Sequence, residues 1–240
     1  NGTGLTGFLR KILFIALFAA FNFSPLEEYW GVVANAQPGF SESVFFSNNY
    51  ITTDIANSED FGQSAAIQPD GKMVVAGYTH NGSGNDFAVV RYNNNGMIDN
   101  SFGIKGRAVM GIKGYDEEAY SVAVQKDGKI LVAGERFNDH STDFAVLRLN
   151  ADGSPDNTFL ESGMATTPIG NSDAYCHSVA VAGGGKIFLA GQSFNGCNWD
   201  MAVVCFQSDG NLDKTFGLKG KLIIDLSNSN DYARSVFCQP

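Results

Sequence analysis

The sequence predicts an all-β protein, and more narrowly a β-propeller built from repeated four-stranded blades. A polar motif recurs every 57 residues, and each repeat alternates short apolar runs with turn residues. The 240 residues include 28 glycines, with 44% hydrophobic and 17% charged residues, which is typical of a turn-rich β protein with a core and not of a disordered chain. Four-stranded units that repeat and cover one another face to face are what a propeller requires.

The 57-residue period is visible in turns, glycines and carboxylates. The QPDGK motif of residues 68–72 recurs as QKDGK at 125–129 and, altered, as AGGGK at 182–186. The aligned glycines include Gly77, Gly134 and Gly191. These coincidences divide residues 37–240 into the full units 59–115, 116–172 and 173–229 and the partial units 37–58 and 230–240.

The second unit shows the four expected strands best. Residues 120–125 (YSVAVQ) alternate, 126–128 form an Asp-Gly hairpin turn, and 129–134 (KILVAG) return. Residues 143–150 (DFAVLRLN) are a strand that is apolar on both faces, and 165–169 supply the fourth. A strand buried on both faces needs a layer on each side, which stacked blades provide.

The first repeat is preceded by residues that align with a fourth strand, 50–54 (YITTD). A propeller that opens on a fourth strand can close its ring by adding that strand to its last blade. Three full units are fewer than the roughly 4 to 8 blades of a ring. The sequence also begins without Met and stops in mid-hairpin, so we expect a fragment of a closed ring.

Residues 1–36 have the layout of a secretory leader. Arg10 and Lys11 precede an apolar run at 12–23, and a polar segment ends at Ala36. Twelve apolar residues are too few for a stable membrane span, so export is expected, with an uncleaved anchor as the alternative. The net charge of −9 with 16 Lys and Arg argues against a nucleic-acid partner.

The repeated motif resembles the delta-60 repeat over roughly residues 39–240. It reads Gln-x-Asp-Gly-Lys, four apolar residues and Gly, then Asp-Phe-Ala-Val with a following Arg, and later Phe-Gly-x-x-Gly. The resemblance implies a β-propeller of bacterial secreted or surface proteins, a domain of unknown function with no catalytic residues to transfer. The third unit departs from it at 182–184 and at Cys205, where the other units have Arg91 and Arg148.

Two sets of repeated carboxylates are predicted to be structural. The first opens the third strand of each unit and is expected to hold a loop by accepting backbone N–H bonds; it comprises Asp86, Asp143 and Asp200. The second comprises Asp99, Asp156 and Asp213. Asp99 and Asp156 are expected to pair with Arg91 and Arg148, and Asp213 to lack such a partner. The segments around the second set loosely resemble calcium loops but lack the full ligand series, so no cofactor or metal is expected, with calcium as the weaker alternative.

A candidate ligand-binding face lies in the loops between second and third strands. These loops vary in composition around an aligned Asn that is expected to shape the turn, and they should share one face with the connections between blades, such as 111–118. The candidate contacts are Asn81, Phe137, Asn138, Phe194, Asn195 and Trp199.

Catalytic and redox motifs are sparse. His80, His140 and His177 occupy different repeat positions and are expected to be solvated, as are the adjacent Glu117 and Glu118. No His-x-His, Cys-x-x-Cys or Gly-x-Ser-x-Gly spacing occurs. In an exported protein Cys176 and Cys197 are candidates for a disulfide, whereas Cys205 sits at an apolar strand position and is expected to be a buried thiol.

The sequence therefore favours a non-catalytic secreted or cell-surface module that binds an unknown protein or glycan. Two alternatives remain open: the propeller part of an exported hydrolase or lyase acting on polysaccharide, and a structural spacer. An enzyme should gather nonrepeating acids, His or metal ligands at the centre of the ring. A scaffold should show only repeated structural polar residues.

Overall fold

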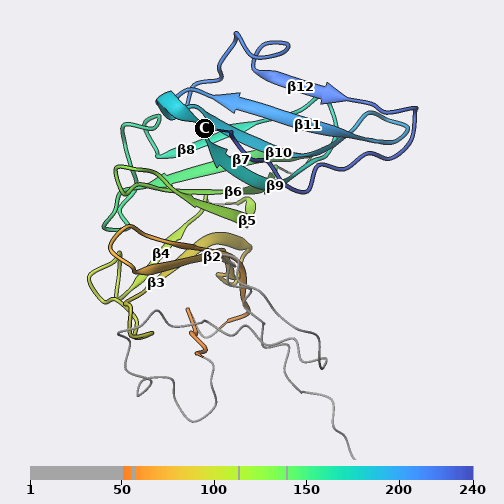
Figure 1. Cartoon of the computed structure of the whole chain (residues 1–240). Helices are drawn as coiled ribbons and strands as arrows, with labels where there is room; N and C mark the ends of the chain where they lie inside the picture. Colours follow the sequence, from red (N-terminus) through yellow and green to blue (C-terminus); the bar gives the residue numbers. More distant parts are fainter. Residues whose placement is uncertain (1–50, 56–57, 113, 139, 240) are drawn as a thin grey trace, which may run out of the picture.

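The computed structural model describes residues 51–55, 58–112, 114–138 and 140–239; the predicted leader and most of the first partial unit lie outside them. Three four-stranded antiparallel sheets are stacked one above another, as Figure 1 shows. Each sheet contains the strands of one 57-residue unit in sequence order. The predicted fold class and four-strand blade are confirmed for these three units, which form an open stack in the described part of the chain.

The strands of the three blades run as follows. Blade 1 contains β1 (Asp60–Ile67), β2 (Met73–His80), β3 (Asn85–Tyr92) and β4 (Arg107–Met110). Blade 2 contains β5 (Asp116–Val124), β6 (Ile130–Phe137), β7 (Thr142–Leu149) and β8 (Met164–Thr167). Blade 3 contains β9 (Ala174–Val181), β10 (Ile187–Phe194), β11 (Trp199–Phe206) and β12 (Lys221–Ile224), with a short 3-10 turn, η1 (Gly183–Gly185), between β9 and β10.

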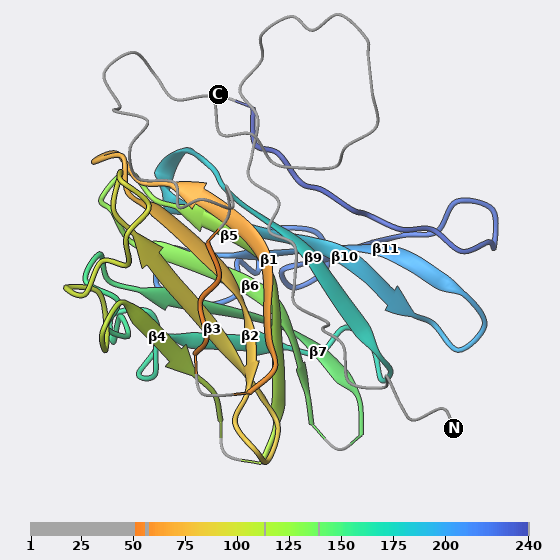
Figure 2. The same ribbon diagram turned by 90° about the horizontal axis from the view of Figure 1, so that it is seen from below.

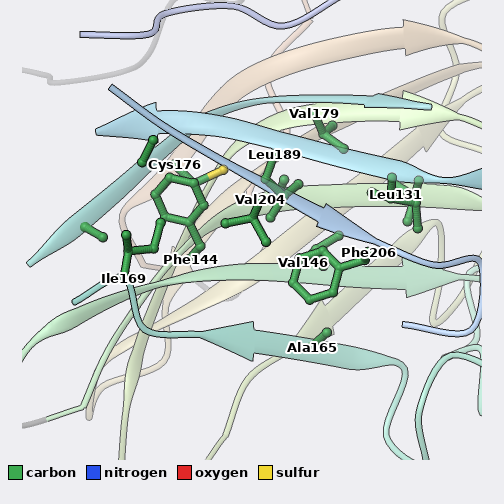
Figure 3. Close-up of a cluster of buried hydrophobic side chains, with 14 of the residues drawn as sticks. Leu131, Phe144, Val146, Ala165, Ile169, Cys176, Val179, Leu189, Val204 and Phe206 are labelled. Atoms are coloured by element: carbon green, nitrogen blue, oxygen red, sulfur yellow. The ribbon is translucent and has the colours of Figure 1, made fainter. Parts of the chain in front are cut away.

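The core lies between blades and not within them. All eight residues of β7 are buried. Phe144 and Val146 belong to the cluster shared with blade 3, shown in Figure 3, whereas Leu147 and Leu149 belong to the cluster shared with blade 1. The strand predicted to be apolar on both faces is therefore covered on both faces, because blade 2 packs between blades 1 and 3.

The first strand of each blade lies at the edge where the blades contact one another most closely, so β1, β5 and β9 run side by side (Figure 2). Each of these strands carries a β-bulge, a register shift that falls between Gly62 and Ser64 in β1 and between Ala119 and Ser121 in β5. β9 shifts at the equivalent place, opposite Gly191. The bulge leaves one extra residue per blade unpaired, and it turns that side chain out of the regular alternation.

The predicted fourth strand at residues 50–54 is not borne out over its described part. Residues 51–54 form no strand, because no third strand precedes them among the described residues to pair with. Ile51 and Ile55 instead pack against Val75, Val90 and Tyr92 of blade 1. They cover the blade face that has no blade beyond it in the described part.

Candidate functional site

A repeated ion-pair cluster ties the third strand of a blade to its turns. In blade 1 the carboxylate of Asp99 accepts bonds from Arg91 Nε at 2.8 Å, Lys72 Nζ at 2.8 Å and Ser101 Oγ at 2.6 Å. Lys72 and Ser101, followed by the charge of Arg91, hold the pKa of Asp99 well below its usual range. The carboxylate is buried and fully paired, which leaves it no capacity for a ligand.

The same arginine links each blade to the next. In blade 2 Arg148 binds Asp156 at 2.6 Å, lies over the ring of Phe159 and donates from Nη1 to the carbonyl of Ser208 in blade 3 at 2.5 Å. Arg91 makes the equivalent bond to the carbonyl of Ala151 in blade 2. These arginines therefore fix the stacking of successive blades.

Blade 3 is the predicted exception. Cys205 replaces the arginine, and Asp213 is held by Lys186 Nζ at 2.6 Å and Thr215 Oγ1 at 2.6 Å, which lower its pKa to about 2. The side chain of Lys186 is half exposed, unlike the buried arginines of the other two blades.

The aligned asparagines shape the hairpins between second and third strands. Asn81 donates from Nδ2 to Asp86 at 2.7 Å, and its Oδ1 accepts the backbone N–H groups of Ser83 and Gly84. Asn138 and Asn195 bind Asp143 and Asp200 in the same way, at 2.8 and 2.9 Å. The carboxylates thus receive a side-chain amide and not the predicted backbone N–H, and a ligand role for the three asparagines stays a prediction.

The predicted aromatic contacts are separated by the structure. Phe137 is 44% exposed at the end of β6. Phe194 and Trp199 instead pack on one another at 5.2 Å, and Trp199 also meets Tyr175 of β9 at 5.1 Å. The hairpins do lie beside the connections between blades, as predicted, because Asp173 accepts the backbone N–H of Thr142 at 2.9 Å.

A second surface was not foreseen as a site: the side chains around the three bulges, here called the inner lining. By strand register Phe61 lies opposite Tyr78, Glu118 opposite Glu135 and Tyr175 opposite Gln192, so each pair shares one face of its blade. The bulge residue stands beside each pair. The lining consists of Phe61, Gln63, Tyr78, Glu118, Tyr120, Glu135, Tyr175, His177, Gln192, Tyr232 and Arg234.

The lining is continuous from blade to blade. The rings of Phe61 and Tyr78 stack at 4.6 Å, Tyr78 meets Tyr120 at 6.4 Å, and Tyr120 meets His177 at 6.2 Å. Beyond blade 3, Arg234 Nη1 lies 3.1 Å from Nε2 of His177. The row therefore crosses all three blades along their closest edges.

Two carboxyl groups of blade 2 converge on one phenol in the lining. Tyr120 donates its hydroxyl proton to Glu118 Oε2 at 2.5 Å, and Glu135 Oε1 lies 3.4 Å from the same oxygen. Burial, and then the charge of Glu118, raise the pKa of Glu135 to about 8. Burial also lowers the pKa of His177, so near neutral pH this part of the lining holds a neutral carboxyl and a neutral imidazole.

Residues 68–102, 125–159 and 185–216 match the family described as "Domain of unknown function (DUF5122) beta-propeller". Each of the three blades contains one of these matched segments. This agrees with the delta-60 resemblance and with the blade structure. No curated protein matches the chain.

The matched segments cover the scaffold and only part of the lining, since Tyr78, Glu135 and Gln192 lie within them and the other lining residues do not. Each matched segment runs from the first hairpin turn to the Phe that follows the clamped carboxylate, so it includes the ion-pair cluster and the Asn–Asp hairpins. The bulge positions fall outside the DUF5122 matches and differ in every blade, as Gln63, Tyr120 and His177; Arg234 is the aligned residue of the partial unit that follows. One sequence signal could have revealed the lining: an aligned position whose residue type changes from repeat to repeat.

Three predictions about single residues were wrong. Glu117 is fully buried under the connection between blades 1 and 2, and burial raises its pKa to about 7. Glu118 and His177 lie in the lining and are not solvated loop residues.

The predicted disulfide is also absent, because Cys176 and Cys197 are both free thiols. Cys176 is buried in the core between blades 2 and 3, as Figure 3 shows, whereas Cys197 is exposed in a hairpin. Cys205 is buried, as expected for an apolar strand position.

Acidic side chains do gather at one other place, at the end of blade 3. Carboxylate oxygens of Asp200, Asp225 and Asp231 lie within 4.8 Å of one another. The segments predicted to resemble calcium loops are elsewhere, and their carboxylates Asp99, Asp156 and Asp213 are engaged by lysine or arginine. Along the described ranges no helix is long and apolar enough to cross a membrane.

The partly buried carboxyl of Glu135 in the inner lining should make stability depend on pH. Because the pKa of Glu135 is raised from 4.5 to about 8, the neutral form stabilises the fold at low pH, and this contribution is lost as the pH rises between those values. Gln stays neutral at every pH. We therefore expect the change in melting temperature caused by Glu135→Gln to be more favourable at pH 9 than at pH 5, by a few degrees. Thermal melts across this range, with the exposed Glu161→Gln as control, test this; an equal effect at both pH values contradicts it.

Proposed function

We propose that this chain is a non-catalytic, exported or cell-surface interaction module whose inner lining contacts the ligand. One observation carries the proposal: repeated and variable polar residues are spatially separated. The repeated Asp, Arg and Asn side chains form hydrogen bonds within and between blades. The variable ones collect on the first and second strands of the three blades and on residues 232–234, and all of them except the buried Gln192 remain at least partly exposed.

This separation is what a constant scaffold with a variable contact surface requires. Binding residues are commonly placed on a rigid framework whose own packing does not depend on them. The export part of the proposal is supported by Arg10, Lys11 and the apolar run at residues 12–23, which lie outside the described part of the chain. A charge of −9 and the absence of a basic cluster favour a partner other than nucleic acid.

The hydrogen bonds of the lining favour binding over catalysis. Nε2 of His177 lies 3.2 Å from Gln192 Oε1 and 3.1 Å from Arg234 Nη1, so its single bonding position is taken by one or the other. The hydroxyl of Tyr120 is committed to Glu118, which also accepts Asn85 Nδ2 at 2.7 Å. Groups that already satisfy one another hold a surface in shape, whereas a general base needs an available lone pair facing the substrate.

A second candidate, an exported enzyme acting on polysaccharide, is favoured by one specific observation. Glu118, Tyr120, Glu135 and His177 are nonrepeating, and Tyr120 contacts the other three. A carboxyl with a pKa near 8 is of the kind that serves as a general acid. The two functions therefore share a surface and differ in what happens to the ligand there.

The test measures binding and turnover on the same probes. The full chain, Tyr120→Ala and the loop-face variant Phe137→Ala are immobilised and exposed to defined neutral, acidic and amino-sugar oligosaccharides and to cationic and anionic peptides. We expect at least one probe to bind the full chain and Phe137→Ala, with affinity at least tenfold lower in Tyr120→Ala, and chromatography of the incubated probe to show no product. Product that disappears in Tyr120→Ala would establish the enzyme instead, and binding lost only in Phe137→Ala would move the contact surface to the hairpin loops.

A further inference from the structure

The inner lining contains aromatic and polar side chains and no aliphatic ones. Every one of its eleven positions carries an aromatic ring or a hydrogen-bonding group, and none is aliphatic. The residues that pack between the blades, by contrast, are mainly Val, Leu, Ile, Ala and Phe. A surface intended only to bury against another protein layer would resemble the second set, so the lining is suited to a ligand that offers both apolar faces and polar edges.

The rings also form a line and not a pocket. Phe61, Tyr78, Tyr120 and His177 follow one another at centroid distances of 4.6, 6.4 and 6.2 Å, one step for each strand crossed. The interplanar angles of 67° and 70° at the second and third contacts are those of edge-to-face ring pairs. An extended ligand made of repeating units can meet a ring at each step, whereas a single compact molecule would meet one.

The polar groups beside the rings can both donate and accept. Gln63 carries an exposed amide, the half-buried hydroxyl of Tyr78 serves in either sense, and the protonated carboxyl of Glu135 adds a donor to its acceptor oxygen. A ligand hydroxyl likewise donates one bond and accepts others, so it matches each of these groups.

The charges in the row disfavour a strongly charged chain. Glu118 and the overall charge of −9 oppose a polyanion, and Arg234, which lies over the ring of Tyr232 at one end of the row, opposes a polycation. A neutral chain incurs neither penalty.

We infer that the inner lining binds a linear, uncharged oligosaccharide laid across the three blades, with successive sugar rings against Tyr78, Tyr120 and His177. The inference rests on the proposed function, since it names the ligand class of the same surface. Sugar rings present apolar C–H faces to aromatic side chains and equatorial hydroxyls to the polar groups beside them, which is the combination that the lining supplies.

The test is calorimetric titration of the full chain with neutral β-1,4-glucose, α-1,4-glucose and β-1,4-N-acetylglucosamine oligosaccharides of one to six units. We expect one series to bind, with affinity rising at least tenfold between one and four units, because each added unit reaches a further ring. Tyr120→Ala, in the middle of the row, should lower the affinity for the longer members at least tenfold, and Tyr120→Phe, which keeps the ring, should lower it less. Leu218→Ala, which shortens an exposed side chain just before β12, at the edge of blade 3 opposite β9, should leave it unchanged.

The outcomes separate this inference from the proposed function. Absence of binding in all three series, or an affinity that does not change with chain length, overturns the oligosaccharide. If a charged sugar or a peptide binds instead and Tyr120→Ala abolishes that binding, the ligand class is wrong and the interaction module stands. If a neutral oligosaccharide binds and is cleaved by the full chain but not by Tyr120→Ala, the ligand class stands and the non-catalytic function fails.

Discussion

Replacing Asp156 with Ala is expected to destabilise the protein by about 3–5 kcal/mol, because it leaves the guanidinium of Arg148 buried without its counter-charge. Asp156 is 2% exposed and accepts bonds from Arg148, Lys129 and Thr158 at 2.6–2.8 Å. Arg148 also fixes the carbonyl of Ser208, so its displacement would loosen the contact between blades 2 and 3. Denaturant unfolding followed by circular dichroism measures the loss.

The chain contains a matched control in blade 3. Asp213 is equally buried, but its cation, Lys186, is half exposed, and the residue in the place of the arginine is the neutral Cys205. Asp213→Ala therefore leaves no buried charge without a partner. It should lower the free energy of unfolding by about 1–2 kcal/mol, the penalty of lost hydrogen bonds. Equal losses at the two positions would show that the arginine does not determine the energetics of this cluster.

Gly134→Ala is expected to prevent β5 and β6 from pairing in their observed register, at a cost of about 4 kcal/mol or more. A Cβ at this position would lie 1.9 Å from the carbonyl oxygen of Glu118 and 2.7 Å from Cα of Ala119, both of them backbone atoms of the bulged strand. Gly77 and Gly191 stand in the same relation to Phe61 and Tyr175, at 1.6 and 1.9 Å. Only glycine at this position leaves room for the backbone of the bulged strand, and the bulge directs the lining residue out of the regular alternation.

Gly183→Ala serves as the control for that substitution. Gly183 starts the short 3-10 turn of blade 3, and a Cβ there would meet nothing within 4 Å. Its effect should stay within about 0.5 kcal/mol. Thermal melts of the two variants answer the question, since a cooperative melt of Gly134→Ala near the wild-type temperature would mean that the strand pair can shift without cost.

The blades were predictable because their determinants are local and repeated. The hairpin turn at 126–128 and the apolar runs on either side of it predict β5 and β6 directly, and the fully buried β7 follows from a run that is apolar on both faces. The pairing of Arg91 and Arg148 with Asp99 and Asp156 was also accessible, because the residues recur together and blade 3 lacks the arginine.

The lining was not predictable in the same way, because it depends on the β-bulge. A bulge breaks the alternation by which a strand sequence assigns side chains to its two faces, so Tyr120 and His177 could not be assigned a direction from their neighbours. Their convergence also requires three strands from different blades to lie side by side, a long-range contact with no local signature. Repeated residues mark the scaffold, whereas the lining lies at aligned positions whose residues change.

We propose that the repeated residues build the blades and that the variable residues of the inner lining contact the ligand. Melting temperature and oligosaccharide affinity, measured on the same preparations of Tyr120→Ala and Asp156→Ala, test this division. We expect Tyr120→Ala to melt within a few degrees of wild type and to lose at least tenfold in affinity, whereas Asp156→Ala should lose stability. A Tyr120→Ala protein that fails to fold, or one that folds and binds as tightly as wild type, would contradict the separation of scaffold and site.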